Sequence, residues 1–195
     1  MKYKLVAFWL IVFGALFAFL QTSFQYHFYY IEQSQLFLFS ESYIGNKLVL
    51  PGGFSMLVAE FLVQFFIRPY IGALVTAALL TGVGICTAGI VKRIAPASGL
   101  FILYMLPMLA LLFMHFDFNY RVQGTVCYLM MTALLCGYMR IRNDLFRLVA
   151  GCVLVPVLFW LAGSIAVLFA GMVCLFEGLQ KTPKWYISLI GVAEV

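Results

Sequence analysis

Six dense apolar stretches, separated by short loops that carry basic residues, constrain this chain more than any other feature. Inside a bilayer every backbone amide and carbonyl must be satisfied within its own segment, so such runs are expected to be helices of roughly 20 residues, enough to cross about 30 Å. Only 10% of the residues are charged and 65% are hydrophobic, whereas a soluble domain spends about a quarter of its residues on charge. We therefore predict an all-α polytopic membrane protein with spans at Leu5–Phe24, Tyr70–Val91, Ala97–Phe116, Val122–Met139, Leu148–Ala162 and Ser164–Leu179.

The last two spans come from one long apolar stretch. As a single helix, the 32 residues from Leu148 to Leu179 would extend about 48 Å, well beyond the hydrocarbon core. We therefore predict a break at Gly163–Ser164. A seventh apolar segment begins near Trp185, and the sequence stops inside it at Val195. This pattern indicates one transmembrane domain, residues 1–195, that forms the N-terminal part of a longer chain.

The positions of the basic residues predict the orientation, since Lys and Arg are retained on the cytoplasmic side of short loops. The N-terminus is read as an uncleaved signal anchor, because its apolar core has no small-x-small cleavage site. We predict a bacterial inner-membrane protein with a cytoplasmic N-terminus. The net charge of +5 then reflects topology and predicts no nucleic-acid partner. On this orientation Lys2, Lys4, Lys92, Arg93, Arg140, Arg142, Arg147, Lys181 and Lys184 are cytoplasmic, and Lys47, Arg68 and Arg121 are outside.

The longest segment between spans, Gln25–Pro69, is predicted to carry the outer polar chemistry. It begins with tyrosines that suit the membrane interface, and its Pro51-Gly52-Gly53 turn leads into an apolar run, Phe54–Ile67. In that run Glu60, Gln64 and Arg68 recur every four residues, which predicts one polar stripe on a helix. Two interpretations stay open: the helix lies along the outer interface, or it joins the next span as one kinked helix.

A second outer polar group lies between the third and fourth predicted spans, around Asp117 and Arg121. The two residues are four apart, so one interpretation is a local ion pair. The other is that Asp117 faces the Glu32 region across a shared outer cavity. No strong catalytic motif, such as a phosphate-binding glycine loop or a Gly-x-Ser-x-Gly elbow, is present in the sequence.

This arrangement resembles the N-terminal half of GT-C membrane glycosyltransferases, and particularly an uncharacterised family of bacterial polytopic proteins. The resemblance is carried by the stretch Tyr30–Phe37, by the Leu50–Phe54 turn with Glu60-Phe61-Leu62 beyond it, and by Trp160–Gly163 through to Glu177. It covers nearly the whole chain. Two GT-C features are missing: a paired Asp-Glu or Asp-Asp after the first span and the usual C-terminal acceptor-binding domain.

The resemblance implies transfer of a sugar from a polyprenyl-linked donor at the outer face, with a carboxylate of the first outer loop acting as base or binding a metal. A carboxylate within hydrogen-bond reach of an acceptor hydroxyl suits that chemistry. The candidate catalytic residues are Glu32, with Glu41 and Asp117 as weaker ones. No metal ligand is assigned, and a divalent metal is left open. The alternatives are a non-catalytic scaffold or subunit of an envelope assembly or export complex, and a lipid or apolar-substrate transporter. Substrate-binding candidates are Gln33, Glu60, Gln64, Arg68 and Arg121.

Overall fold

The computed structural model describes residues 2–94 and 101–179, and these residues form helices joined by short turns. The order of helices follows the apolar pattern of the sequence, with three short helices and a 3-10 turn inserted after the first long one. The elements are α1 (Lys2–Ser23), α2 (Gln25–Ser34), α3 (Glu41–Leu48), α4 (Gly53–Val63), η1 (Gln64–Ile67), α5 (Ile71–Ile94), α6 (Phe101–Met114), α7 (Val122–Tyr138), α8 (Asp144–Ala162) and α9 (Ile165–Leu179).

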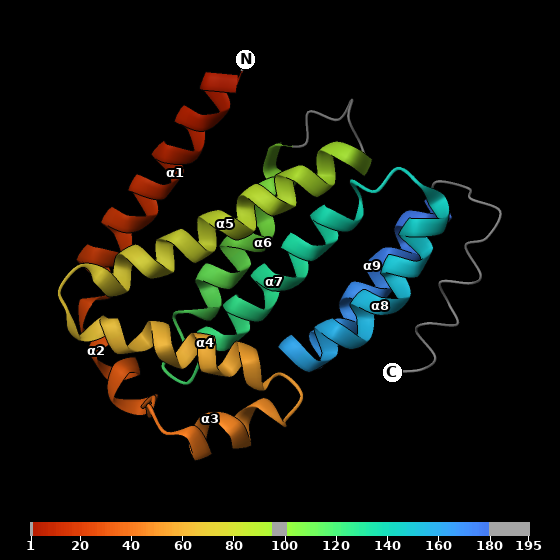
Figure 1. Ribbon diagram of the computed structural model, residues 1–195. Helices are drawn as coiled ribbons and strands as arrows, with labels where there is room; N and C mark the ends of the chain where they lie inside the picture. Colours follow the sequence, from red (N-terminus) through yellow and green to blue (C-terminus); the bar gives the residue numbers. More distant parts are fainter. Residues whose placement is uncertain (1, 95–100, 180–195) are drawn as a thin grey trace.

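The long helices run up and down between two ends of the molecule, and the short helices gather at one of them (Figure 1). The N-terminus of α1 lies at the upper end in this view, as does the turn between α7 and α8. The α2–α4 segment and the turns after α6 and α8 lie at the lower end. Helix α4 runs crosswise beneath the bundle and packs against α7 and α8. We call residues 25–70, which include α2, α3, α4 and η1, the cap.

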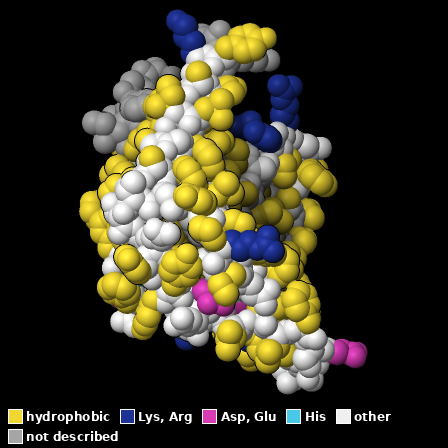
Figure 2. Space-filling view, turned by 90° about the vertical axis from the view of Figure 1, so that its left-hand side faces the viewer, with side chains coloured by type: hydrophobic (Ala, Val, Ile, Leu, Met, Phe, Trp, Pro, Cys, Tyr) yellow, Lys and Arg dark blue, Asp and Glu magenta, His cyan; other side chains and the backbone are white. Residues whose placement is uncertain are grey.

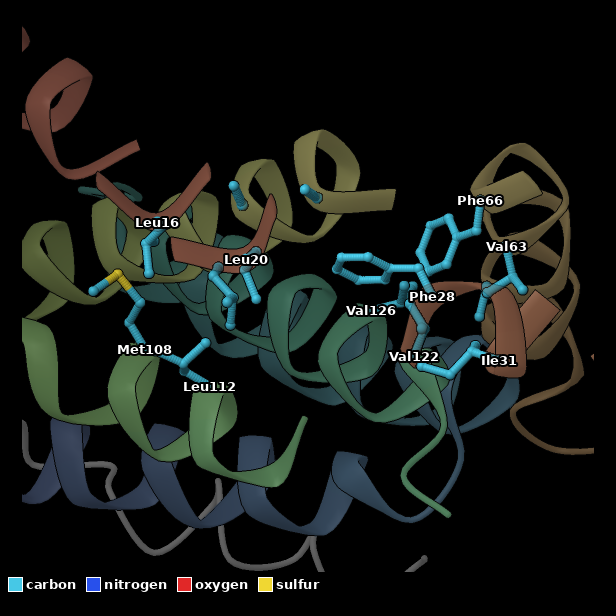
Figure 3. Packing of buried hydrophobic residues seen from close by; sticks show 14 residues of the cluster. Leu16, Leu20, Phe28, Ile31, Val63, Phe66, Met108, Leu112, Val122 and Val126 are labelled. Atoms are coloured by element: carbon cyan, nitrogen blue, oxygen red, sulfur yellow. The ribbon is translucent and has the colours of Figure 1, made fainter. Parts of the chain in front are cut away.

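Helix α7 is the centre of the bundle because both hydrophobic clusters use it. The first cluster contains residues of α1, α2, α4, η1, α5, α6 and α7, among them Leu20, Phe28 and Val126 (Figure 3). In this cluster the Phe28 ring packs edge-on against the Phe66 ring of η1. The second cluster joins α7 to α8 and α9 around Phe169, which is fully buried. The cap is thereby held to the bundle by apolar burial, the dominant favourable contribution to folding and packing.

A buried ion pair fastens the upper end of α8 to α9. The guanidinium of Arg147 donates to both carboxylate oxygens of Glu177, at 2.6 and 3.0 Å, and the hydroxyl of Tyr138 donates to the same carboxylate at 2.9 Å. Arg147 was expected in a loop, because the span was predicted to begin at Leu148. The helix begins earlier because the Asn143 side chain accepts the N–H of Leu145 and caps it.

Much of the bundle surface is apolar, which suits a bilayer better than water. Leu10 and Ile11 on α1, Val153 on α8 and Leu175 on α9 are all more than half exposed. Figure 2 shows hydrophobic side chains over most of one face, with acidic side chains only in its lower part and basic ones at its upper end and again just above the acidic side chains.

Among the described residues, three helices are long and apolar enough to cross a membrane: residues 3–23, 71–94 and 144–162. This fits a membrane location and the predicted all-α class. The described parts of the apolar helices α6, α7 and α9 have 14, 17 and 15 residues, or about 21 to 26 Å at 1.5 Å per residue, shorter than the hydrocarbon core. Each of the six predicted stretches thus contains a helix, but only three of these helices, among the described residues, are long enough to be identified as spans.

Two predicted breaks are confirmed. Helix α8 ends at Ala162 and α9 begins at Ile165, with Gly163 at φ 71° in the turn. Residues 54–67 form a helical unit separate from α5, because Arg68 is extended and Tyr70 has φ 72°. The kinked-helix alternative is therefore wrong. The expected segment near Trp185, and the residues 97–100 of the third predicted span, lie outside the described residues.

Candidate functional site

The Pro-Gly-Gly turn lets the cap sit tightly against the α8–α9 turn. Gly52 has φ 77°, which favours glycine, and a Cβ there would lie 3.2 Å from the backbone nitrogen of Gly163. The N–H of Gly52 donates to the carbonyl of Trp160 at 2.9 Å, and the Trp160 indole donates to the carbonyl of Leu48 at 2.9 Å. Two glycines in contact and two reciprocal hydrogen bonds therefore fix the start of α4 relative to α8.

Glu60 is the buried acid of the cap and is paired within it. Its carboxylate accepts hydrogen bonds from the Lys47 ammonium and, at 2.7 Å, from the Tyr43 hydroxyl. The Lys47 ammonium also lies 4.5 Å from the centre of the Tyr43 ring. Burial lowers the pKa of Lys47, but its hydrogen bonds to Glu60 and Tyr43 outweigh burial and raise the pKa above its usual value. Lys47 therefore stays charged, and the main role of Glu60 is to hold α4 against α3 through its bonds to Lys47 and Tyr43.

The predicted polar stripe is only partly correct. Glu60 faces α3, and the side-chain amide of Gln64 donates to the carbonyl of Phe37 at 3.0 Å, so both residues lie beneath the chain segment 36–47. Arg68 is exposed and extended, beyond the end of η1. The helix tightens into a 3-10 turn at Gln64, which ends the four-residue repeat before Arg68. Two of the three stripe residues, Glu60 and Gln64, therefore form hydrogen bonds within the cap, and only Arg68 is exposed.

Two neighbouring pockets meet at Arg121 and Gln123, where α7 begins under the cap. The smaller, of about 150 Å³, lies between the end of α2 and α4, and the larger, of about 370 Å³, lies between α7 and the α8–α9 turn. The smaller pocket is lined by Ser34, Gln35, Leu36, Met56, Ala59, Glu60, Arg121 and Gln123, and the larger by Tyr120, Arg121, Gln123, Gly124, Cys127, Ala162, Ser164 and Ile165.

The floor between the pockets is polar and internally bonded. The hydroxyl of Ser55 donates to the Gly52 carbonyl at 2.7 Å, and the thiol of Cys127 donates to the Ser55 oxygen at 3.1 Å. The Gln123 amide nitrogen lies 3.4 Å from both the Gly52 carbonyl and the Ser55 oxygen. Arg121 is exposed at the rim and forms no ion pair within residues 2–94 and 101–179. An anionic group in either pocket would meet this guanidinium first.

The predicted catalytic acids are not gathered into one cluster. Glu32 is half-buried in the last turn of α2, two residues before the pocket residue Ser34, whereas Gln33 is exposed. Glu41 is exposed at the start of α3, and Asp117 is exposed in the α6–α7 turn. Within the described part of the chain, no three His, Cys, Asp or Glu residues come together as a metal site would require.

The predicted ion pair between Asp117 and Arg121 does not form in the described residues. The Asp117 carboxylate instead accepts the backbone N–H of Asn119 at 2.9 Å, a local turn that short acidic side chains favour. The same turn packs on α2, because the Phe118 ring lies 4.7 Å from His27 and 5.7 Å from Tyr30. The turn thus lies beside the first outer loop, whereas a cavity shared by Asp117 and the Glu32 region stays a prediction.

Several residues of the site were missed from the sequence. Tyr43 and Lys47 pair with Glu60 across 17 and 13 positions, so no helical or strand repeat marks them. The only signal in the sequence for the Lys47–Glu60 pair was that the two residues carry opposite charges and lie in the same long loop. Gln123 and Ser55 are ordinary polar residues in apolar runs, and only the crossing of α4 over α7 brings them together.

Comparison with known proteins places the chain in a family. The sequence profile described as "Family of unknown function (DUF6057)" matches residues 1–195. No curated protein and no solved structure matches the chain. These comparisons give the GT-C resemblance no support, while they agree with the expected membership in an uncharacterised family. The chain belongs to the family of unknown function DUF6057.

Proposed function

We propose that the protein is a multi-pass inner-membrane protein with six spans, a cytoplasmic N-terminus and the cap on the outer face. Three helices of sufficient length and the exposed apolar side chains of α1, α8 and α9 support insertion. The described parts of helices α6, α7 and α9 are shorter than the hydrocarbon core, and a short span is accommodated by local thinning of the bilayer or by association with neighbouring helices. The basic turn between α7 and α8, with Arg140 and Arg142 exposed, supports this orientation.

The proposed activity is GT-C-like transfer of a sugar from a polyprenyl-linked donor at the cap. One observation carries it: two pockets at the capped end share Arg121, a cation exposed at their rim. A guanidinium binds phosphate oxygens through paired hydrogen bonds, which suits the phosphate of a lipid-linked donor. The larger pocket also reaches Ser164 and Ile165 in the α8–α9 turn, which leaves a route toward the apolar helix surface.

Glu32 is the proposed base in this reaction. It lies half-buried on the last turn of α2, the turn that also carries the pocket residue Ser34. Glu60 lines the same pocket but is bound to Lys47 and Tyr43, so its role there is to hold the pocket wall. A base must come within hydrogen-bond reach of the acceptor hydroxyl, and Glu32 forms no competing ion pair within the described ranges.

Binding of polyprenyl phosphate to the full chain in nanodiscs tests the site. Because a hydrogen bond to a charged group contributes about 1.5–3 kcal/mol, we expect Arg121→Gln to weaken binding about tenfold to a hundredfold. The control is Arg142→Gln, which removes another exposed cation, at the opposite end, and is expected to leave affinity unchanged. Equal affinity of the Arg121→Gln variant and the unaltered protein contradicts the proposed site.

Sugar transfer in membranes tests the base separately. Loss of general-base catalysis costs about 10²–10⁴ in rate, so Glu32→Gln is expected to abolish transfer from a labelled polyprenyl-linked sugar while polyprenyl phosphate still binds. Asp144→Asn, at the opposite end of the bundle, serves as the control. Unchanged transfer in the Glu32→Gln variant removes Glu32 from the mechanism.

A second candidate function, a non-catalytic scaffold of an envelope complex, is favoured by one surface. Phe37, Phe39, Phe61 and Phe65 lie in mutual ring contact on the cap, and all but Phe37 are exposed. Exposed aromatic clusters of this kind mark interaction sites. A scaffold would tolerate Glu32→Gln and Arg121→Gln, and would lose its cross-linked partner on replacement of Phe61 and Phe65 with serine.

A further inference from the structure

The chain has two histidines, and both are buried together where the cap meets the α6–α7 turn. His27 lies on α2 and is 5% exposed, and His115 follows the end of α6 and is 2% exposed. The His27 ring lies 5.8 Å from the Phe24 ring and 4.7 Å from the Phe118 ring. Two titratable side chains thus form part of an otherwise aromatic contact between two segments that are far apart in sequence.

The two imidazoles have few polar partners. The Nε2 atom of His27 is buried and has no hydrogen-bond partner. The Nε2 atom of His115 lies 2.9 Å from the hydroxyl of Thr125, which also lies 3.1 Å from the Tyr120 hydroxyl. A neutral imidazole tolerates such surroundings, whereas a protonated one requires acceptors for both of its N–H groups. Protonation therefore conflicts with this packing.

The charged and titratable groups around the pair come from both segments. Asp117, in the same turn as His115, is an exposed carboxylate whose field favours a charge on His27. Tyr120 lies 4.9 Å, ring to ring, from His115, and burial raises its pKa, so it stays neutral at any acidic pH. The two histidines also oppose each other, since a charge on one disfavours a charge on the other.

We propose that His27 and His115 form an acid-sensitive latch that holds α2 against the α6–α7 turn while both are neutral and releases it when they are protonated. Release would withdraw the last turn of α2, including the pocket residue Ser34, from the site beside Arg121. The latch is a property of the fold and does not depend on the proposed sugar transfer. Histidine suits this role because its ordinary pKa lies near neutrality.

The direction of the response follows from the titration of each ring. Burial lowers the pKa of His27, with Asp117 opposing, and burial together with His27 lowers the pKa of His115 to about 4. In the released state both rings regain an ordinary pKa near 6.5. Below that value the released state binds more protons than the closed one, so the closed state loses stability as the pH falls from about 6.5 to about 4.

Hydrogen–deuterium exchange of the full chain in nanodiscs tests the latch. After correction for intrinsic exchange rates, protection of the α2 amides and of residues 115–121 is expected to fall at least about tenfold between about pH 7.5 and about pH 5, because one pKa unit corresponds to a factor of ten in the closed–released equilibrium. Helix α8, which lies outside this contact, is expected to keep its protection.

The matched variant combines His27→Phe, which keeps an aromatic ring against Phe24 and Phe118, with His115→Gln, which keeps a hydrogen-bonding side chain beside Thr125. Its α2 protection is expected to be the same at both pH values. Equal protection of the unaltered protein at both pH values overturns the latch, as does acid release of the double variant. Because the unaltered protein alone can give the first result, the test stands even if the double variant does not fold.

Discussion

Replacing Gly53 with alanine is expected to open the cap and to cost about 3 kcal/mol or more of folding stability. A Cβ at this position would lie 1.7 Å from the carbonyl oxygen of Lys47 and 2.7 Å from its carbonyl carbon. Both atoms belong to the backbone, so the overlap is relieved only if α3 moves away from α4. That movement separates Lys47 from Glu60 and Leu48 from Trp160, and the cap loses its polar contacts together.

Thermal unfolding of the purified protein in detergent measures this effect, with Gly45→Ala as the matched control. Gly45 lies inside α3 and a Cβ there meets nothing within 4 Å. Alanine favours the helix at such a position by about 0.5–1 kcal/mol, so the control is expected to be unchanged or slightly more stable. If Gly53→Ala unfolds at the same temperature as Gly45→Ala, the described contact between the turn and α3 is wrong.

The second large effect is expected at the opposite end, where Glu177→Ala leaves the Arg147 guanidinium buried without its main partner. Breaking a buried pair by removing one member costs about 3–5 kcal/mol, because the remaining charge stays desolvated. The Tyr138 hydroxyl loses its acceptor in the same variant. We expect the contact between α8 and α9 to weaken at their upper ends, and this loss of stability is measured as a lower midpoint of detergent-mediated unfolding.

Asp144→Ala is the control for this prediction. Asp144 also pairs with Arg147, at 3.1 Å, but its side chain is 77% exposed, and exposed pairs contribute about 0–1 kcal/mol. Removing both buried charges, with Arg147→Leu and Glu177→Leu together, is expected to be less harmful than Glu177→Ala alone, since no uncompensated charge remains. A double variant less stable than Glu177→Ala contradicts a simple pairing role.

The helices could be predicted from the sequence because apolar runs favour helices, and glycine turns end them, through neighbouring residues alone. Each predicted stretch became a helix, and Gly163 with its left-handed φ ended α8 where the length argument required a break. The separate helix after Gly52-Gly53 could also be anticipated, since the Arg68-Pro69 pair disfavours a continuous helix. Helix ends were less predictable, because α8 begins at Asp144 instead of Leu148 and α5 continues to Ile94, past the predicted end at Val91.

The candidate site was less predictable because it depends on contacts across long sequence distances. Arg121 and Glu60 were identified as outer polar residues, but the pairing of Glu60 with Lys47 and Tyr43 depends on how α3 folds back over α4. The buried Arg147–Glu177 pair joins residues 30 positions apart, so charge counting placed Arg147 on the cytoplasmic side without linking it to Glu177. Local patterns carry no information on such pairings, which only tertiary packing decides.

Site-directed labelling tests the central claim, that the polar cap lies on the outer face of the membrane and the α7–α8 turn on the cytoplasmic face. In a background where the five native cysteines, Cys86, Cys127, Cys136, Cys152 and Cys174, are replaced, one new cysteine is placed at Ser42 on the cap or at Arg142 in the opposite turn. Both positions are exposed. A membrane-impermeant maleimide applied to intact spheroplasts is expected to label the Ser42 position and not the Arg142 position. Labelling of both positions from the same side would contradict the account.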